Sequence, residues 1–196
     1  MWAMLKKFIN STVGNKNSKP LDEIIETELY NNYYEIVSNT LGTSETCLVV
    51  PMGVETITHR DYAEKASSTT SIILPITTIY LDYNAFKDFT AIRKIVLPKN
   101  VNFIGESSFE GCSNMEYADI RSNGITTIDL AFKSCPKLKT VIIRSKNPYF
   151  KYSDKSIFAA CNALQDIYVG WSKGEFEGAP WGAPPIAAIH YNLEGL

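Results

Sequence analysis

Three cysteines recur in one sequence frame, and they are the residues of this chain best suited to redox or metal chemistry. Cys112, Cys135 and Cys161 each follow a phenylalanine by three residues, while Cys47 lies outside this frame. If the frame is a structural repeat, the three thiols stack roughly 5 Å apart, which is within the Cα range of a disulfide. Their side chains would then run parallel to one another, and the sequence offers no C-x-x-C pair and no nearby histidine for a zinc site. We therefore predict buried free thiols and no metal site.

The two histidines, His59 and His190, do not belong to a recognisable catalytic motif. A nucleophilic pair would need Cys47 beside His59, and no residue near them in sequence is suited to activate the thiol. The sequence contains no H-E-x-x-H, G-x-S-x-G, P-loop or G-x-G-x-x-G motif. We therefore expect a protein that is not an enzyme and needs no cofactor. An enzyme that uses the thiols is the alternative.

The elements that position these thiols form an internal repeat. Its anchors are four phenylalanines separated by 23, 23 and 26 residues: Phe86, Phe109, Phe132 and Phe158. A second series of residues marks the ends of six short strands between about residues 48 and 169: Val50, Leu74, Leu97, Ile120, Ile143 and Val169. Self-similarity at this period indicates a solenoid, in which each repeat buries its core against its neighbours.

Each repeat unit is predicted to combine a short strand with a tight helical turn. The triplet Ile95-Val96-Leu97 alternates between inward and outward side chains, as a short strand does. The Phe-x-x-Cys-x-x-Leu step has helical or 3₁₀ spacing. Stacked units would share a continuous core that contains a column of phenylalanine rings.

The outward strand residues are expected to line up in rows across the sheet and to form a binding face. One row contains Ile73, Val96, Asp119, Ile142 and Tyr168, and the neighbouring row contains Ser71, Lys94, Tyr117, Thr140 and Asp166. From these rows and the strand exits, the candidate binding residues are Lys94, Val96, Tyr117, Asp119, Arg121, Ile142, Arg144 and Tyr168. Aromatic, apolar and singly charged groups on a rigid sheet suit a protein partner or a cell-surface glycan. The alternative is that they are ordinary exposed strand residues.

Charge is unevenly distributed along the 196 residues, although the formal net charge is only −2. Residues 1–19 carry four lysines and no acid, residues 20–59 carry seven acids and no lysine or arginine, and the remainder has a net charge of +1. So small a net charge argues against a dedicated nucleic-acid binder. No stretch approaches the ~20 apolar residues of a membrane helix, and the first residues form a poor secretory signal.

A separate helical segment is expected before the repeats. Residues 20–38 have a good helix start and an amphipathic pattern, so this helix is expected to cover the first coil. Before it lies a short apolar stripe, a candidate attachment site formed by Trp2, Leu5, Phe8 and Ile9. Residues 1–46 are therefore assigned to an N-terminal attachment segment.

An aromatic cap is expected after the repeats. Trp171, Phe176, Trp181 and a final short strand at 186–191 would cover the open end of the solenoid. The alternative for the two tryptophans is stacking on a sugar ring. Residues 47–170 are therefore assigned to the solenoid and residues 171–196 to the cap.

The repeat frame resembles that of the BspA-like leucine-rich repeats, I-x-L-P-x-x-V-x-x-I-G-x-x-A-F-x-x-C-x-x-L. Here the frame contains Ile95-Val96-Leu97-Pro98, Val101, Ile104-Gly105, Ser108-Phe109, Cys112 and Met115. The unit near residues 54–75 departs from it, with Glu64 at the phenylalanine position and Ser67 at the cysteine position. The resemblance implies an α/β leucine-rich repeat solenoid of about five coils with short parallel strands.

Both ends of the chain also resemble repeat proteins encoded in prophage tail regions of gut Firmicutes. The residues concerned are Ala179-Pro180-Trp181-Gly182-Ala183 and Ile189-His190-Tyr191-Asn192 at one end, and residues 4–14 at the other. The resemblance implies a bacteriophage tail, fibre or baseplate accessory protein, located in the virion, that recognises a host surface or a neighbouring virion protein. Within such an assembly the chain could form a homo-oligomer. The alternatives are a bacterial surface adhesin and a cytoplasmic interaction scaffold.

Overall fold

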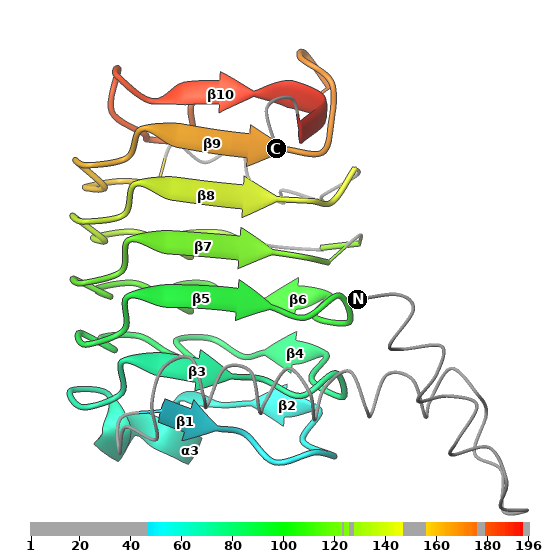
Figure 1. Cartoon of the computed structure of the whole chain (residues 1–196), viewed down its shortest axis with the longest axis vertical. Helices are drawn as coiled ribbons and strands as arrows, with labels where there is room; N and C mark the ends of the chain where they lie inside the picture. Colours follow the sequence, from blue (N-terminus) through cyan, green and yellow to red (C-terminus); the bar gives the residue numbers. More distant parts are fainter. Residues whose placement is uncertain (1–46, 123, 126–127, 147–155, 176–178, 194–196) are drawn as a thin grey trace, which may run out of the picture. The chain divides into compact units, whose positions relative to one another are not determined.

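The fold is a solenoid of parallel strands, seen in a computed structural model that describes residues 47–122, 124–125, 128–146, 156–175 and 179–193. Its larger sheet has seven strands in the order β1 (Cys47–Val49), β3 (Ser71–Ile73), β5 (Lys94–Leu97), β7 (Tyr117–Ile120), β8 (Thr140–Ile143), β9 (Asp166–Val169) and β10 (Ala188–His190). A smaller sheet consists of β2 (Thr56–Ile57), β4 (Tyr80–Leu81) and β6 (Phe103–Ile104). Figure 1 shows the strands of the larger sheet stacked one above another, so that each coil contributes one strand.

The strand register agrees with the one predicted from the repeat. Leu97 pairs with Ile120, Ile120 with Ile143, and Ile143 with Val169, all in parallel orientation. The additional strand expected at 186–191 is β10, which pairs with β9 through Ile189 and Ile167. The predicted solenoid with short parallel strands is therefore confirmed.

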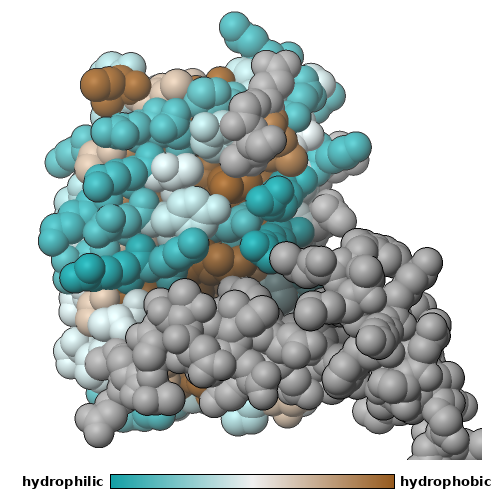
Figure 2. All heavy atoms as spheres, in the orientation of Figure 1, coloured by the Kyte–Doolittle hydropathy of each residue, from teal (hydrophilic) through white to brown (hydrophobic). Residues whose placement is uncertain are grey.

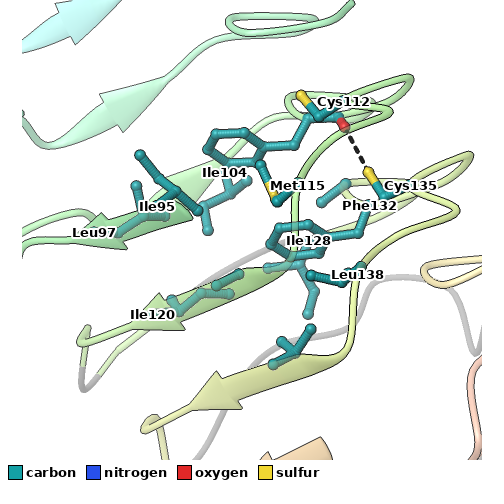
Figure 3. Close-up of a cluster of buried hydrophobic side chains, with 14 of the residues drawn as sticks. Ile95, Leu97, Ile104, Cys112, Met115, Ile120, Ile128, Phe132, Cys135 and Leu138 are labelled. Atoms are coloured by element: carbon teal, nitrogen blue, oxygen red, sulfur yellow. Dashed lines mark hydrogen bonds between the residues drawn. The ribbon is translucent and has the colours of Figure 1, made fainter. Parts of the chain in front are cut away.

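A column of phenylalanine rings runs through the middle of the core. The centroids of Phe86 and Phe109 lie 5.6 Å apart, those of Phe109 and Phe132 5.5 Å, and those of Phe132 and Phe158 6.1 Å, with interplanar angles of 22° or less. All four rings are fully buried. Figure 3 shows Phe132 among buried side chains of neighbouring coils, including Ile120 in β7 and Leu138 in the turn before β8. Because each ring contacts the ring of the next coil, the column links the coils into one core.

The Phe-x-x-Cys-x-x-Leu step forms two successive tight turns, so the helical turn predicted from its spacing is wrong. The Cys112 N–H donates to the Phe109 carbonyl (3.3 Å), and the Met115 N–H donates to the Cys112 carbonyl (3.0 Å). Within the first turn Gly111 has φ +76°, and Ser134 and Ala160 occupy the same position in the next coils with φ +59° and +61°. A left-handed residue interrupts an α-helix, so the turns keep i→i+3 bonds without forming a helix.

The first unit, near residues 54–75, departs from the repeat frame and contains two short helical segments. Helix α3 (His59–Tyr62) is followed by the 3₁₀ segment η1 (Ala63–Lys65). The Thr58 N–H donates to the Asp61 carboxylate at 2.6 Å, which holds the start of α3. Helical residues thus replace the Phe-x-x-Cys turn that the sequence of this unit lacks.

The C-terminal residues cover the end of the solenoid as predicted. Trp171 and Trp181 are buried and pack edge to face, with ring centroids 5.7 Å apart. The Phe158 N–H donates to the Trp181 carbonyl at 3.0 Å, which is the bond that each earlier phenylalanine makes to the next coil. Residues 179–183 therefore act as a final turn. The last described residues form the 3₁₀ segment η2 (Tyr191–Leu193).

The expected N-terminal helix at 20–38 and the attachment stripe of Trp2, Leu5, Phe8 and Ile9 lie outside the described residues, as does Phe176. In the part of the chain that the structure describes, none of the helices has the length and apolar character needed to cross a lipid bilayer.

Candidate functional site

The outer side of the larger sheet carries the two predicted rows from β5 onward. Their first predicted members lie in β3, where Ser71 pairs with Lys94 and Ile73 is buried. Pairing across the strands aligns Val96, Asp119, Ile142, Tyr168 and His190 in one row. The same pairing aligns Lys94, Tyr117, Thr140, Asp166 and Ala188 in the neighbouring row. We call these two rows, with Arg121 and Arg144 at the strand exits, the outer face. Hydrophilic atoms predominate over β5 to β9, and hydrophobic atoms form a narrow band among them (Figure 2).

A cluster of three charged residues forms the centre of the outer face. Asp119 lies in β7 and its side chain is only 2% exposed. Arg144 donates to it through Nε (2.9 Å to Oδ1) and Nη2 (3.1 Å to Oδ2), and Arg121 donates through Nε (3.1 Å to Oδ2). The hydrogen bond to Asp119 raises the pKa of Arg144 further. The carboxylate therefore holds two guanidinium groups in fixed positions, and each group keeps further N–H donors.

Exposure differs among the candidate residues more than their outward position suggested. Lys94 and Arg121 are exposed, and Val96, Tyr117, Arg144 and Tyr168 are partly exposed, whereas Asp119 and Ile142 are buried at 2%. Both buried residues point outward from a strand, but the long side chains of adjacent positions shield such sites. Asp119 and Ile142 are therefore suited to support the face, and the residues around them are suited to contact a partner.

Lys94 and Tyr117, the first residues of β5 and β7, form a pair on the outer face. The Lys94 ammonium lies 4.6 Å from the centroid of the Tyr117 ring, which is a cation–π distance. Burial, and secondarily the negative charge of Asp119, raise the pKa of the Tyr117 hydroxyl. Tyr117 therefore remains a neutral hydrogen-bonding group across the ordinary pH range.

His190 extends the outer face to the last strand, which the sequence did not indicate because the residue fell in the capping segment. Its Nε2 lies 2.8 Å from the Asp166 carboxylate, and its ring stacks on Tyr168 with centroids 4.3 Å apart and an interplanar angle of 14°. The three side chains come from β9 and β10. They form a compact polar and aromatic group at the end of the rows.

The cysteines are free thiols, as predicted, and their hydrogen bonds are structural. Cys112, Cys135 and Cys161 are buried, and their Sγ atoms donate to the carbonyl oxygens of Phe86, Phe109 and Phe132 at 3.3, 3.2 and 2.9 Å. The neighbouring Cys112 thiol, together with burial, raises the pKa of Cys135, and the Cys135 thiol and burial raise that of Cys161. A thiol that stays protonated is a poor nucleophile and a poor metal ligand. Across the described ranges, no group of three or more His, Cys, Asp or Glu side chains is placed to hold a metal ion.

The sequence did not indicate an aromatic group and a polar cleft beside the smaller sheet. Tyr80 and Tyr83 are 49% and 59% exposed, and the Phe103 ring lies between them, with centroids 6.1 and 6.2 Å away. The cleft has a volume of about 360 Å³ and is bounded by loops that precede β2, β4 and β6. Both features arise from chain segments about one repeat apart, and strands of two residues leave too short a pattern to detect in sequence.

Residues 46–177 match a family model described as BspA type leucine rich repeat region, in six copies. The chain is similar to a solved leucine rich cell surface protein of Faecalibacterium prausnitzii A2-165, with 25% identity and a TM-score of 0.59 over 68% of this chain and 35% of that one. It is also similar in fold to the pneumococcal vaccine antigen PcpA, with 22% identity and a TM-score of 0.58 over 74% of this chain and 35% of that one. A third similar fold is the T. pallidum leucine rich repeat protein, with 20% identity and a TM-score of 0.52 over 72% of this chain and 66% of that one. No curated protein matches the sequence. The chain thus spans about a third of the length of the F. prausnitzii protein and of PcpA.

Proposed function

The chain belongs to the BspA-type leucine-rich repeat family, and we propose that it is a non-catalytic binding protein whose outer face recognises a protein partner. The family and the solenoid support binding, because such folds present an extended rigid surface made of repeated strands. The unreactive thiols support a role without catalysis.

The observation that carries this proposal is the pair of arginines fixed by a buried carboxylate. Arginine and tyrosine are enriched among the residues that dominate protein interfaces, and a guanidinium that is already oriented loses less conformational entropy on binding. Arg121, Arg144 and Lys94 outnumber the acids of the outer face, Asp119 and Asp166, and Asp119 is buried beneath its partners. We propose that the partner presents a carboxylate to the Arg121 and Arg144 side chains.

Two settings have support of different kinds. The resemblance of both chain ends to prophage-encoded repeat proteins supports a place in a phage tail, fibre or baseplate, with binding to a host surface or a virion protein. The similarity to a protein described as a cell surface protein supports an adhesin on the bacterial surface. Antibody labelling distinguishes them: an adhesin labels intact producing cells, whereas a virion component labels particles purified after lysis.

Site-specific crosslinking tests the outer face in either setting. A photoreactive amino acid in place of Lys94 should give one discrete crosslinked product on cells or particles that carry the partner. The same amino acid in place of Lys137, an exposed residue that lies outside the outer face and donates to Asn114, serves as the matched control. We expect Arg121→Ala to lower the yield at position 94 at least tenfold. Equal yields at the two positions, or no effect of Arg121→Ala, would contradict the proposal.

A further inference from the structure

A polar cleft lies where three successive coils leave the larger sheet. Its loops follow β1, β3 and β5, and each begins at a proline: Pro51, Pro75 and Pro98. Each proline carbonyl accepts the N–H of the residue three positions later, at 3.4, 3.0 and 3.2 Å. The cleft between the loops has a volume of about 360 Å³, which is in the range of sites for small ligands, ~300–1,000 Å³.

Hydrogen bonds between the loops hold the cleft in shape. Thr77 Oγ1 accepts the Gly53 N–H at 3.0 Å and donates to the Val54 carbonyl at 3.2 Å. Asn100 Nδ2 donates to the Ile76 carbonyl at 2.8 Å. The three coils are therefore connected through side chains as well as through their strands. A cleft that is already formed binds a ligand without the entropic cost of ordering its walls.

The chemistry of the cleft lining is that of a site for hydroxyl groups. Glu55 supplies carboxylate acceptors, Lys99 supplies ammonium donors, and Asn100 and Asn102 supply amides that offer both kinds of group. Ile76 and Ile79 add apolar surface. One acid and one base leave the lining without net charge, so it complements a neutral polar molecule better than a phosphate or a lipid tail.

An aromatic shelf continues directly from the cleft. In β4, Tyr80 follows the cleft residue Ile79, and in β6, Phe103 follows Asn102. Pairing of β4 with β6 sets Tyr80 beside Phe103, and Tyr83 packs edge-on against the same ring. The two tyrosines are 49% and 59% exposed. The C–H groups of a sugar ring pack on such aromatic faces while its hydroxyls bond to polar groups beside them.

We propose that this cleft and its aromatic shelf form a binding site for a neutral saccharide. One pyranose ring stacks on Tyr80, and the hydroxyls of that sugar or its neighbour bond to Glu55, Asn100 and Asn102. The site lies beside the smaller sheet and uses none of the residues assigned to the outer face. The saccharide proposal can therefore be tested independently of the protein partner proposed above.

Titration of the full chain with three neutral trisaccharides, cellotriose, chitotriose and maltotriose, tests the site. Ligand-observed NMR should show saturable contact with at least one of them, and calorimetry gives its affinity. We expect Tyr80→Ala and Glu55→Gln each to weaken that affinity at least tenfold. The matched control Tyr117→Ala, on the outer face, should leave it unchanged.

The folding of each variant is checked by its thermal unfolding, because Tyr80 and Glu55 are both exposed and their replacement should leave the core intact. No saturable contact with any of the three sugars at millimolar concentration would overturn the proposal. So would binding by Tyr80→Ala at the affinity of the unaltered chain. Weakening by Tyr117→Ala instead would place the sugar on the outer face and would also overturn it.

Discussion

The Sγ atom of Cys135 donates a hydrogen bond of 3.2 Å to the carbonyl oxygen of Phe109, the aromatic anchor of the preceding coil (Figure 3). The same bond joins Cys112 to Phe86 and Cys161 to Phe132. The repeated cysteine therefore has two structural tasks, since it fills a small apolar space and satisfies a buried carbonyl of its neighbour.

Replacement of Cys135 by alanine should destabilise the protein, because it leaves the Phe109 carbonyl without its donor and opens a small cavity. We expect the free energy of unfolding in urea to fall by about 1–3 kcal/mol. Cys47→Ala is the comparison, because Cys47 is partly exposed and lies outside the thiol column. A loss for Cys135→Ala no larger than that for Cys47→Ala would show that the thiol bond has no role in stability.

Thiol accessibility in the folded state should separate Cys47 from the other three cysteines. Cys112, Cys135 and Cys161 are buried, whereas Cys47 is partly exposed. We expect a thiol-specific disulfide reagent to modify one group per chain under native conditions and four after denaturation. Mass spectrometry of the labelled peptides identifies the group, and rapid native labelling of Cys135 would be inconsistent with the fold.

Stability should decrease at alkaline pH because of the same thiols. The Cys112 thiol and burial raise the pKa of Cys135 above its unfolded value of about 8.5. The unfolded chain then releases this proton at lower pH than the folded chain, so the contribution to stability is complete below about pH 8.5 and is lost as pH rises above it. Urea denaturation between pH 7 and 10 should show this decline, and it should be smaller in Cys135→Ala. An equal decline in both proteins would assign it to other groups.

Truncation of Phe132 should lower the free energy of unfolding most, because its ring stacks between two others. Its ring lies between those of Phe109 and Phe158, with centroids 5.5 and 6.1 Å away. Phe132→Ala should lower the free energy of unfolding by about 3–5 kcal/mol, because the coils on both sides cannot collapse into the cavity without losing strand register. Phe103→Ala, which removes a partly exposed ring from the smaller sheet, should cost less than half of that. A loss below about 1 kcal/mol for Phe132→Ala would contradict the ring column.

Gly105 marks a close approach of two coils. A Cβ atom at this position would lie 2.6 Å from the Asp82 carbonyl carbon and 2.6 Å from the Tyr83 nitrogen. These are backbone atoms that cannot move away independently, so Gly105→Ala should cost about 1–3 kcal/mol in chemical denaturation. Gly124→Ala is the control, because a Cβ there meets no atom within 4 Å. Equal stability of the two variants would show that the coils can separate at this point.

The parts of this fold that repeat could be predicted from sequence, and the parts that depend on contacts between non-equivalent residues could not. The strand ends Leu97, Ile120 and Ile143 fixed the register because stacking places equivalent residues side by side. The burial of Asp119 and Ile142 depends on the lengths of neighbouring side chains, which strand alternation does not encode. The cleft and aromatic shelf depend on the approach of three loops, and no single segment carries their signature.

Asp119 allows stability to be separated from binding. Its side chain is 2% exposed, whereas those of Arg144 and Arg121 are 34% and 50% exposed and so retain much of their hydration. Arg144→Ala should destabilise the protein by about 1–3 kcal/mol, because it removes a bidentate partner from a buried carboxylate.

Asp119→Ile places an apolar side chain between Val96 and Ile142, its neighbours in the row. This variant should leave stability unchanged or raise it, since the buried charge disappears. The two arginines then lose their fixed orientation, and crosslinking from position 94 should fall although the fold is intact. An unfolded Asp119→Ile variant, or full crosslinking by a folded one, would show that the carboxylate does not orient the binding face.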